Sequence, residues 1–455
     1  MIARLPALAA ALFLVGLTSS QSVRQPPRPP LELRLTEAPQ PVYSADPHDS
    51  WNRIFYYLFS RRFQAYVSGS FPEYGPFRDF QGLAGRGIFQ VSTRTFEWQE
   101  TGDRPIDALY PSQFTDEGVR FVLLDPTYTE LCRALDEALG EHAERTITAR
   151  ALMQSDLWSA FDILVINWYF KENGAPELEP RRLALLDRIG RLIARIALTP
   201  EQIGLLPNNS IAARASTSLT DLFNKKSGWI EIQWFPHRLH DEAAGNRRVT
   251  RVFLHPTRPP GDIQRFLNDF RKQTSPPGSR LDAVALAIQP LLIDTHGRLQ
   301  PSNLTIDVQA RFFQRTPTGS LQKTEIGVYE FRRQRLLREP ASGGLVAESE
   351  NDPAYASFGG QDFTLAPRLS NDPGLLTPLI VKLRTRCVAC HGSEDLTTVM
   401  TFSLILAPHE GRGPEVRQLD PAAHQAAEFV ISQKEKSGDW KALHNYFEAG
   451  GNAAH

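Results

Sequence analysis

The hydrophobic period of this sequence changes near Gly228, and this change restricts the fold more than any other feature. Upstream of it, apolar residues recur at the spacings of three and four that mark one face of a helix. Downstream, apolar and polar residues alternate, which is the pattern of a half-buried strand. The clearest alternation is formed by Leu304, Ile306, Val308, Ala310 and Phe312. We therefore expect an α+β fold with a mainly helical N-terminal half and an antiparallel β-sheet in the middle.

Apolar residues recur at helical spacing in several stretches outside the middle of the chain, and we expect a helix in each. The stretches in the first half are 51–67, 127–143, 148–172 and 180–198, and those near the C-terminus are 421–433 and 439–447. Asp49 and Ser50 precede the first stretch and supply a cap for its N-terminus. Residues 70–120 carry glycines, prolines and aromatic residues without a clean period, so we expect irregular structure there, with short strands at best.

The alternating segments predict the strands of the sheet. They cover 230–234, 248–254, 284–288, 304–312 and 326–331, with a helix at 259–272 inserted between the second and the third. An antiparallel sheet commonly has one face on the core and one face in water, so we expect one wet face. We interpret Asp307, Gln309 and Arg311 as part of that solvated face and not as a catalytic row.

The clearest candidate for a cofactor-binding motif is the segment RCVACHG at residues 386–392. Cys387 and Cys390 enclose two residues and His391 follows directly, which is the C-x-x-C-H pattern of c-type haem attachment. The spacing has a chemical reason. Each thiol can form a thioether with one haem vinyl group, and the adjacent imidazole is then held at the iron as its proximal ligand. We expect one haem c, bound covalently by Cys387 and Cys390 and ligated by His391.

This segment resembles the haem-binding motif of the c-type cytochromes, in which glycine after the histidine is also common. The resemblance covers only residues 386–392. It implies a bound haem, a methionine or histidine further along as the sixth ligand, and electron transfer. Residues 341–455 are therefore expected to form a C-terminal haem-binding lobe of helices and loops. The large body that precedes them is foreign to a small carrier cytochrome.

Two other interpretations of the paired cysteines stay open. They could form a redox dithiol of the thioredoxin type, but that motif normally opens a helix after a strand, and residues 375–386 end in a basic run. They could also be half of a zinc site, although no second C-x-x-C or H-x-x-x-H pair completes four ligands.

The sixth iron ligand is not fixed by the sequence. Met400 is the only methionine after the motif and is our candidate, with a hydrophobic core residue as its alternative role. The candidate histidines are His409, His424 and His444 downstream, and His237 and His240 upstream. A vacant position also stays open. Methionine would raise the reduction potential and block the iron, which suits electron transfer, whereas an open iron would permit peroxide, NO or O2 chemistry.

The N-terminus has the features of a secretory signal peptide. Arg4 precedes the apolar run LPALAAALFLVGL, and small residues follow it at 18–20. A membrane span needs about 20 apolar residues, so the run is too short to be one. We expect cleavage near residue 20, a periplasmic or secreted location and no integral membrane segment in the mature protein.

The expected organisation follows from these features. We assign residues 1–20 to the signal peptide, 21–47 to a proline-rich linker, 48–225 to a mainly helical region, 226–340 to the antiparallel β region and 341–455 to the haem-binding region. The linker is expected to lie along the domain surface near 31–35.

Composition excludes some classes of function. Lys and Arg number 50 and Asp and Glu number 51, so no basic footprint for nucleic acid is present. With three cysteines the chain is not a disulfide scaffold, and Cys132, beside the helical stripe of Leu131 and Leu135, is expected to be a buried free thiol. No hydrolase motif is found. Asp156 and Asp162 are on different faces of a helix and form no catalytic pair.

The leading hypothesis is an exported monohaem c-type cytochrome that passes single electrons to or from a redox partner protein. It describes an electron carrier more than an enzyme. Two alternatives are kept: a haem enzyme or gas sensor with an open iron, and a binding protein in which the haem is structural.

Overall fold

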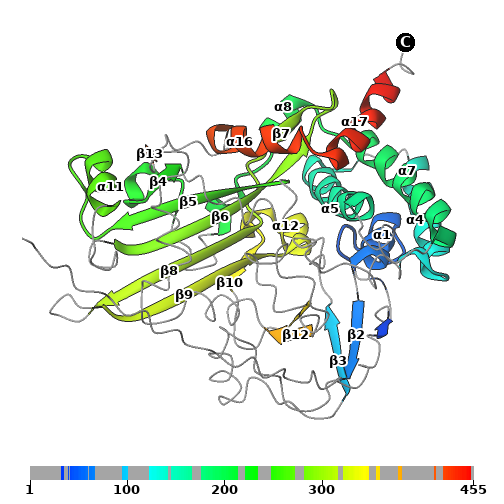
Figure 1. Ribbon diagram of the computed structural model, residues 1–455, viewed down its shortest axis with the longest axis horizontal. Coiled ribbons are helices and arrows are strands. Elements are labelled where there is room, and N and C mark those ends of the chain that lie inside the picture. The colour runs from blue at the N-terminus through cyan, green and yellow to red at the C-terminus, as the bar shows by residue number, and fades with distance from the viewer. Residues whose placement is uncertain are drawn as a thin grey trace, which may run out of the picture.

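A computed structural model describes the core of the protein. The residues it describes are 32–34, 39, 41–59, 61–66, 95–100, 122–141, 145–166, 176–213, 221–233, 247–271, 281–315, 321–347, 355–358, 378–381, 415–416 and 424–451. Within them the fold is α+β, with helices packed against an antiparallel sheet (Figure 1). The change of period near Gly228 is therefore matched by a change from helices to strands.

Four long helices form one end of the molecule (Figure 1). They are α1 (Ser50–Phe59), α4 (Thr127–Gly140), α5 (Ile147–Ile166) and α7 (Glu179–Arg195). Short helices α8 (Pro200–Gly204) and α9 (Asn209–Ala213) follow. The four helical predictions in this half are thus confirmed over the described residues, except at the end of the first. Asp49 caps α1 as expected, because its Oδ1 accepts a hydrogen bond of 2.9 Å from the Trp51 amide.

The first predicted helix is wrong beyond Phe59. Residues 61–66 form strand β2 (Arg61–Tyr66), between β1 (Glu32–Arg34) and β3 (Thr95–Glu100) in an antiparallel sheet. Strand pairing between segments this far apart in sequence overrides the local helical spacing. β1 lies where the linker was expected to run along the surface. Val42 and Tyr43 are already in the main core, so the folded body begins before residue 48.

The large sheet is antiparallel throughout the described strands. Its order is β10-β9-β8-β6-β5-β4-β13, with β7 paired to β6. The strands are β4 (Ile230–Gln233), β5 (Arg248–Pro256), β6 (Leu281–Ile293), β7 (Leu299–Pro301), β8 (Asp307–Arg315), β9 (Leu321–Phe331), β10 (Leu345–Ala347) and β13 (Glu415–Val416). The inserted helix α11 (Ile263–Arg271) is confirmed. The predicted strands are likewise confirmed over the described residues, except that residues 304–306, expected to begin the fourth, precede β8 and are not in a strand.

The expected wet face is wrong for the centre of the sheet. Nearly every residue of β6 is buried, which requires cover on both faces. One face joins the main core with the helices, and the other carries a second cluster formed by Ile230, Ile232, Val252, Leu254, Leu267, Leu281, Val284, Leu286 and Phe313. Of the polar ladder, Arg311 is buried and Asp307 and Gln309 are half-buried. Alternation separates the two faces of a strand, but it does not tell what covers each face.

The C-terminal helices α16 (His424–Lys434) and α17 (Gly438–Gly451) are also confirmed. They do not stand apart from the body: Ala427, Val430, Trp440 and Leu443 belong to the main core. Gly190 of α7 allows α17 to approach closely, since a Cβ at that position would lie 2.5 Å from the ring of Tyr446. Helix α17 thus packs on α5 and α7 of the helical half, whereas α16 lies against β5 and β7 of the large sheet (Figure 1).

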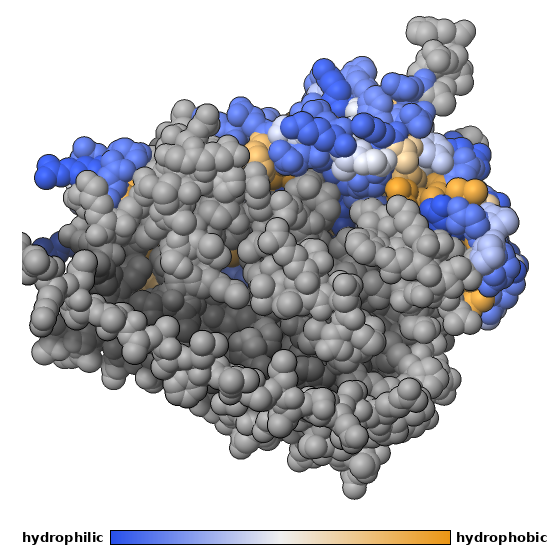
Figure 2. Space-filling view, in the orientation of Figure 1, coloured by the Kyte–Doolittle hydropathy of each residue, from blue (hydrophilic) through white to orange (hydrophobic). Residues whose placement is uncertain are grey.

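The remaining described elements are small. Helix α12 (Arg333–Arg338) follows β9, and strands β11 (Tyr355–Phe358) and β12 (Pro378–Val381) pair with each other. Figure 2 shows hydrophilic residues over the upper side of the molecule, around α16 and α17, with small hydrophobic areas near α7. Among the described helices, none has the length and apolar character that a bilayer crossing requires.

Candidate functional site

The predicted haem-attachment residues lie outside the part of the chain that the structure describes. This holds for Cys387, Cys390, His391 and the candidate ligand Met400, and also for His237, His240 and His409. The described strands on either side of the motif belong to different sheets. β12, which precedes it, pairs with β11, whereas β13, which follows it, pairs with β4 at the edge of the large sheet.

Two of the histidines considered as sixth ligand are described. His424 is exposed at the first residue of α16. His444, on α17, is half-buried, with its ring centroid 5.4 Å from that of Trp440 and its Nδ1 3.5 Å from a carboxylate oxygen of Glu448. Both lie on helices anchored in the main core. Their distance from the haem motif is outside the described geometry.

Two carboxylates of α5 are among the most deeply buried ionisable groups of the described residues. Asp156 and Asp162 both come from this helix, are almost fully buried, and take part in two separate networks. The prediction that these two carboxylates lie on different faces of the helix and form no pair is therefore confirmed. Asp156 instead pairs with Arg333, and Asp162 pairs with Arg247 and Lys434, all from distant parts of the chain.

The network at Asp162 joins four elements through two acids and two bases. Asp162 Oδ2 lies 2.6 Å from Lys434 Nζ and 2.8 Å from Arg247 Nε. Lys434, at the end of α16, also donates to Asp439 at the start of α17, and Arg247 precedes β5 and donates to Ser159. The formal charges cancel. A buried ion cluster of this kind is tolerated only while each charge keeps its partner.

The pKa values in this network are set by burial. Burial raises the pKa of Asp162 to about 7, against the lowering effect of Lys434 and Arg247, and the neighbouring charge of Asp439 raises it further. The pKa of Asp439 is lowered overall: its own burial is the largest single cause and acts upward, but the charge of Lys434 and the hydrogen bonds with Lys434, Ser437 and Asp162 together outweigh it. Asp162 can therefore bind a proton near neutral pH although it touches two cations.

Folding is expected to raise the proton affinity of Asp162, which makes the free energy of unfolding depend on pH. Below pH 4 both the folded and the unfolded chain hold this proton. Between about pH 4 and pH 7 only the folded chain does, so the free energy of unfolding falls with rising pH, by up to about 4 kcal/mol from this group. Urea unfolding of the wild type and of Asp162→Asn at pH 5 and pH 8 measures the contribution of Asp162 to the free energy of unfolding. An equal pH dependence in the two proteins would contradict the assignment to Asp162.

The second network on α5 joins the segment before α1 to helix α12. Arg333, the first residue of α12, donates two hydrogen bonds to Asp156, from Nε to Oδ2 at 2.9 Å and from Nη2 to Oδ1 at 2.6 Å. The hydroxyl of Tyr43 donates to the same Oδ2. All three side chains are buried. A bidentate pair of this geometry fixes both groups strongly.

A third buried ion pair lies within the large sheet. Arg251 of β5 meets Glu231 of β4 through Nε at 2.9 Å and Nη2 at 2.6 Å, and Gln289 of β6 accepts a further bond of 3.2 Å. The guanidinium carbon of Arg251 lies 4.6 Å from the ring centroid of Phe223. Because the partners are on adjacent strands, this pair fixes the register of β4, β5 and β6.

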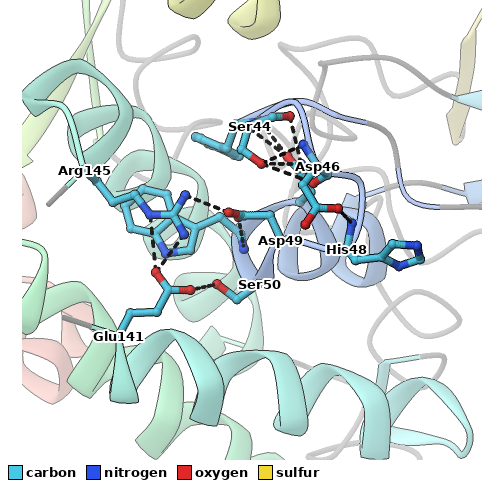
Figure 3. A network of polar contacts seen from close by, with 10 residues as sticks. Ser44, Asp46, His48, Asp49, Ser50, Glu141 and Arg145 are labelled. Carbon is cyan, nitrogen blue, oxygen red and sulfur yellow. Dashed lines mark hydrogen bonds and ion pairs between the residues drawn. The ribbon is translucent and has the colours of Figure 1, made fainter. Parts of the chain in front are cut away.

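A more exposed network connects the start of α1 with the turn between α4 and α5 (Figure 3). Arg145 lies between two carboxylates, with Nη1 2.8 Å from Asp49 and Nη2 2.7 Å from Glu141. Ser50 donates to Glu141, and the Arg145 guanidinium lies 4.9 Å from the ring centroid of Trp51. These contacts fix the two helix ends to each other.

None of these networks forms a site for a metal ion. In the ranges that the structure covers, no group of three or more His, Cys, Asp or Glu side chains could hold one. Cys132 is a buried free thiol, as predicted, and burial raises the pKa of its thiol. The described networks bind the elements of the fold together.

Comparison with known proteins identifies no relative. No protein-family model matches the chain, no curated protein matches its sequence, and no solved structure matches its fold.

Proposed function

We propose that this protein is an exported monohaem c-type cytochrome-like protein that transfers single electrons to or from a redox partner protein. The observation that carries the proposal is the segment Cys387-Val388-Ala389-Cys390-His391 in a chain whose N-terminus has the sequence features of a secretory signal peptide. The donor set fits haem c: two thiols at the spacing of the two vinyl groups, and an imidazole next to the second. The bound haem would supply a one-electron Fe(III)/Fe(II) couple.

The residues of the chain have separate roles in this proposal. Cys387 and Cys390 attach the porphyrin and fix its position against the backbone. His391 ligates the iron on the proximal side, and Met400 is the candidate on the other side. The haem-binding lobe is proposed within residues 341–455, of which β10, β13, α16 and α17 belong to the large sheet and the main core of the body. A periplasmic or secreted location follows from the export signal.

An iron with both axial positions filled is expected from an electron carrier. The isolated protein should therefore show a low-spin, six-coordinate haem that binds CO slowly after reduction. The measurement is stopped-flow mixing of the dithionite-reduced protein with CO, together with absorption and EPR spectra of the oxidised form. Rapid CO binding to a high-spin haem would contradict electron transfer as the sole role.

The candidate ligand Met400 can be tested in the same experiment. Met400→Leu should turn the haem high-spin and speed CO binding if the sulfur ligates the iron. Met153→Leu is the matched control, because it makes the same replacement of methionine by leucine at a buried position of α5. An unchanged spectrum in Met400→Leu would assign the sixth position to another group.

A haem enzyme or gas sensor with an open iron is the second candidate. It is favoured by the size of the body, because a mere carrier does not require a seven-strand path of antiparallel sheet and a core of long helices. The CO experiment separates the two candidates directly. A binding protein with a structural haem would instead bind its partner only when haem is attached.

A further inference from the structure

The small sheet β1-β2-β3 has an apolar face and a polar face. Phe63 of β2 is paired with Leu33 of β1 and with Trp98 of β3, and Ala65 of β2 is paired with Phe96 of β3. Directly opposed residues lie on the same face of a sheet, and every second residue of a strand returns to that face. These five apolar residues therefore share one face, at adjoining register positions.

The opposite face of the same sheet is polar. Its paired positions are Gln64 with Glu97, Arg62 with Gln99, and Tyr66 with Thr95. The apolar face ends in a charged pair, Arg61 with Glu100, at the start of β2. A sheet of three strands depends on cover over its apolar face for stability, so this face requires an apolar partner.

Strand β12 lies close to the small sheet and leads into the haem motif. β3 and β11 approach each other to within 8 Å between Cα atoms, and β11 pairs with β12 (Figure 1). β12 ends at Val381, and Cys387 follows six positions later, a span of at most about 20 Å of extended chain. On the other side of the motif, 24 positions separate His391 from Glu415, so β13 sets no comparable limit. The motif is therefore tethered within short reach of the small sheet.

A haem attached to this tether brings a large apolar surface with it. The macrocycle is flat and apolar, and its charged groups are the two propionates at one edge. Because removal of the macrocycle from water is favourable, an apolar face within reach of the tether is a suitable cover. Phe63 and Trp98 suit a flat ring system, since an aromatic residue buries roughly 150–250 Å² and packs well against other rings.

We propose that the apolar face of the sheet β1-β2-β3 is one wall of the haem pocket, with Phe63 and Trp98 against the macrocycle. This inference rests on the proposed function, because it requires the haem bound at Cys387 and Cys390. The wall excludes water from one side of the haem, which lowers the polarity around the iron and raises its reduction potential. The haem pocket then combines strands from the start of the chain with residues 341–455.

The test is 19F NMR of the haem-loaded full chain labelled with 5-fluorotryptophan. The signal absent from Trp98→Phe identifies Trp98. Its resonance should shift and broaden in the ferric form relative to the reduced form, more than that of Trp158 in the main core, because the unpaired electron of Fe(III) acts at short range. A haem-loaded protein whose Trp98 resonance is the same in both forms would overturn the proposal and leave the proposed function intact. A chain without attached haem would overturn both.

Two variants of β2 test which face meets the haem. Phe63→Gln places a polar amide on the proposed wall and should lower the midpoint reduction potential, since a more polar surrounding stabilises the charged ferric state. Tyr66→Gln makes the same kind of replacement on the opposite face and should keep the wild-type potential. Haem staining of denaturing gels verifies that both variants carry haem. A wild-type potential in Phe63→Gln, or an equal shift in the two variants, would contradict the assignment of this face.

Discussion

Replacing Lys434 with methionine is expected to lower the free energy of unfolding by about 3–5 kcal/mol at pH 8. Methionine fills the space of the lysine stem but carries no charge. Asp162 and Asp439 then remain buried with only Arg247 as a cationic partner, and α16 and α17 lose the contact that ties their turn to α5. Since this turn leads α17 into the main core, the loss is expected to be felt in global unfolding.

The matched control is Lys436→Met, two positions along in the exposed turn after α16. A surface substitution there should change the free energy of unfolding by less than about 0.5 kcal/mol. Urea denaturation followed by tryptophan fluorescence gives both values. Equal stability of the two variants would show that the Asp162 network does not hold the C-terminal helices.

Replacing both Cys387 and Cys390 with alanine is expected to abolish covalent haem attachment. With no thiol at either position, no thioether can form, and any haem held by His391 alone is released when the chain is denatured. Haem staining of denaturing gels, after production with a cytochrome c maturation system, measures the attached haem. The double variant should show none.

Cys132→Ala supplies the matched control from the same chain. Cys132 is a buried free thiol in α4, outside the motif, and its replacement removes one sulfur without touching the attachment site. This variant should retain haem at the level of the wild type. Haem on the double variant, or its loss from Cys132→Ala, would contradict attachment through Cys387 and Cys390.

Much of the fold could be predicted from hydrophobic period alone. The stripes at Leu131 and Leu135 in α4, and at Ile189 and Ile193 in α7, are regular because one helix face meets the core. The change to strands near Gly228 is equally local. The end of α1 was missed because Arg61–Tyr66 pairs with Glu32–Arg34 and Thr95–Glu100, and such pairing leaves no periodic signal in one segment.

The buried charges were harder to predict. Asp162 and Lys434 are separated by 272 positions in the sequence, so spacing could not bring them together. The only local signal is that Asp156 and Asp162 interrupt or border an apolar stretch of α5, where an acid must find a partner. The burial of the Arg251–Glu231 pair could not be predicted for a similar reason. Alternation separates the two faces of a strand, but it does not show that the main core covers this face. The haem motif, in contrast, is contiguous and visible in sequence.

The central claim is that one haem is bound covalently at Cys387 and Cys390. Its most direct test is the alkaline pyridine haemochrome spectrum of the exported protein, produced together with a cytochrome c maturation system. We expect a c-type absorption band with one haem per chain, retained after acid–acetone extraction. A protein without bound haem under these conditions would contradict the claim and leave the two cysteines as a dithiol.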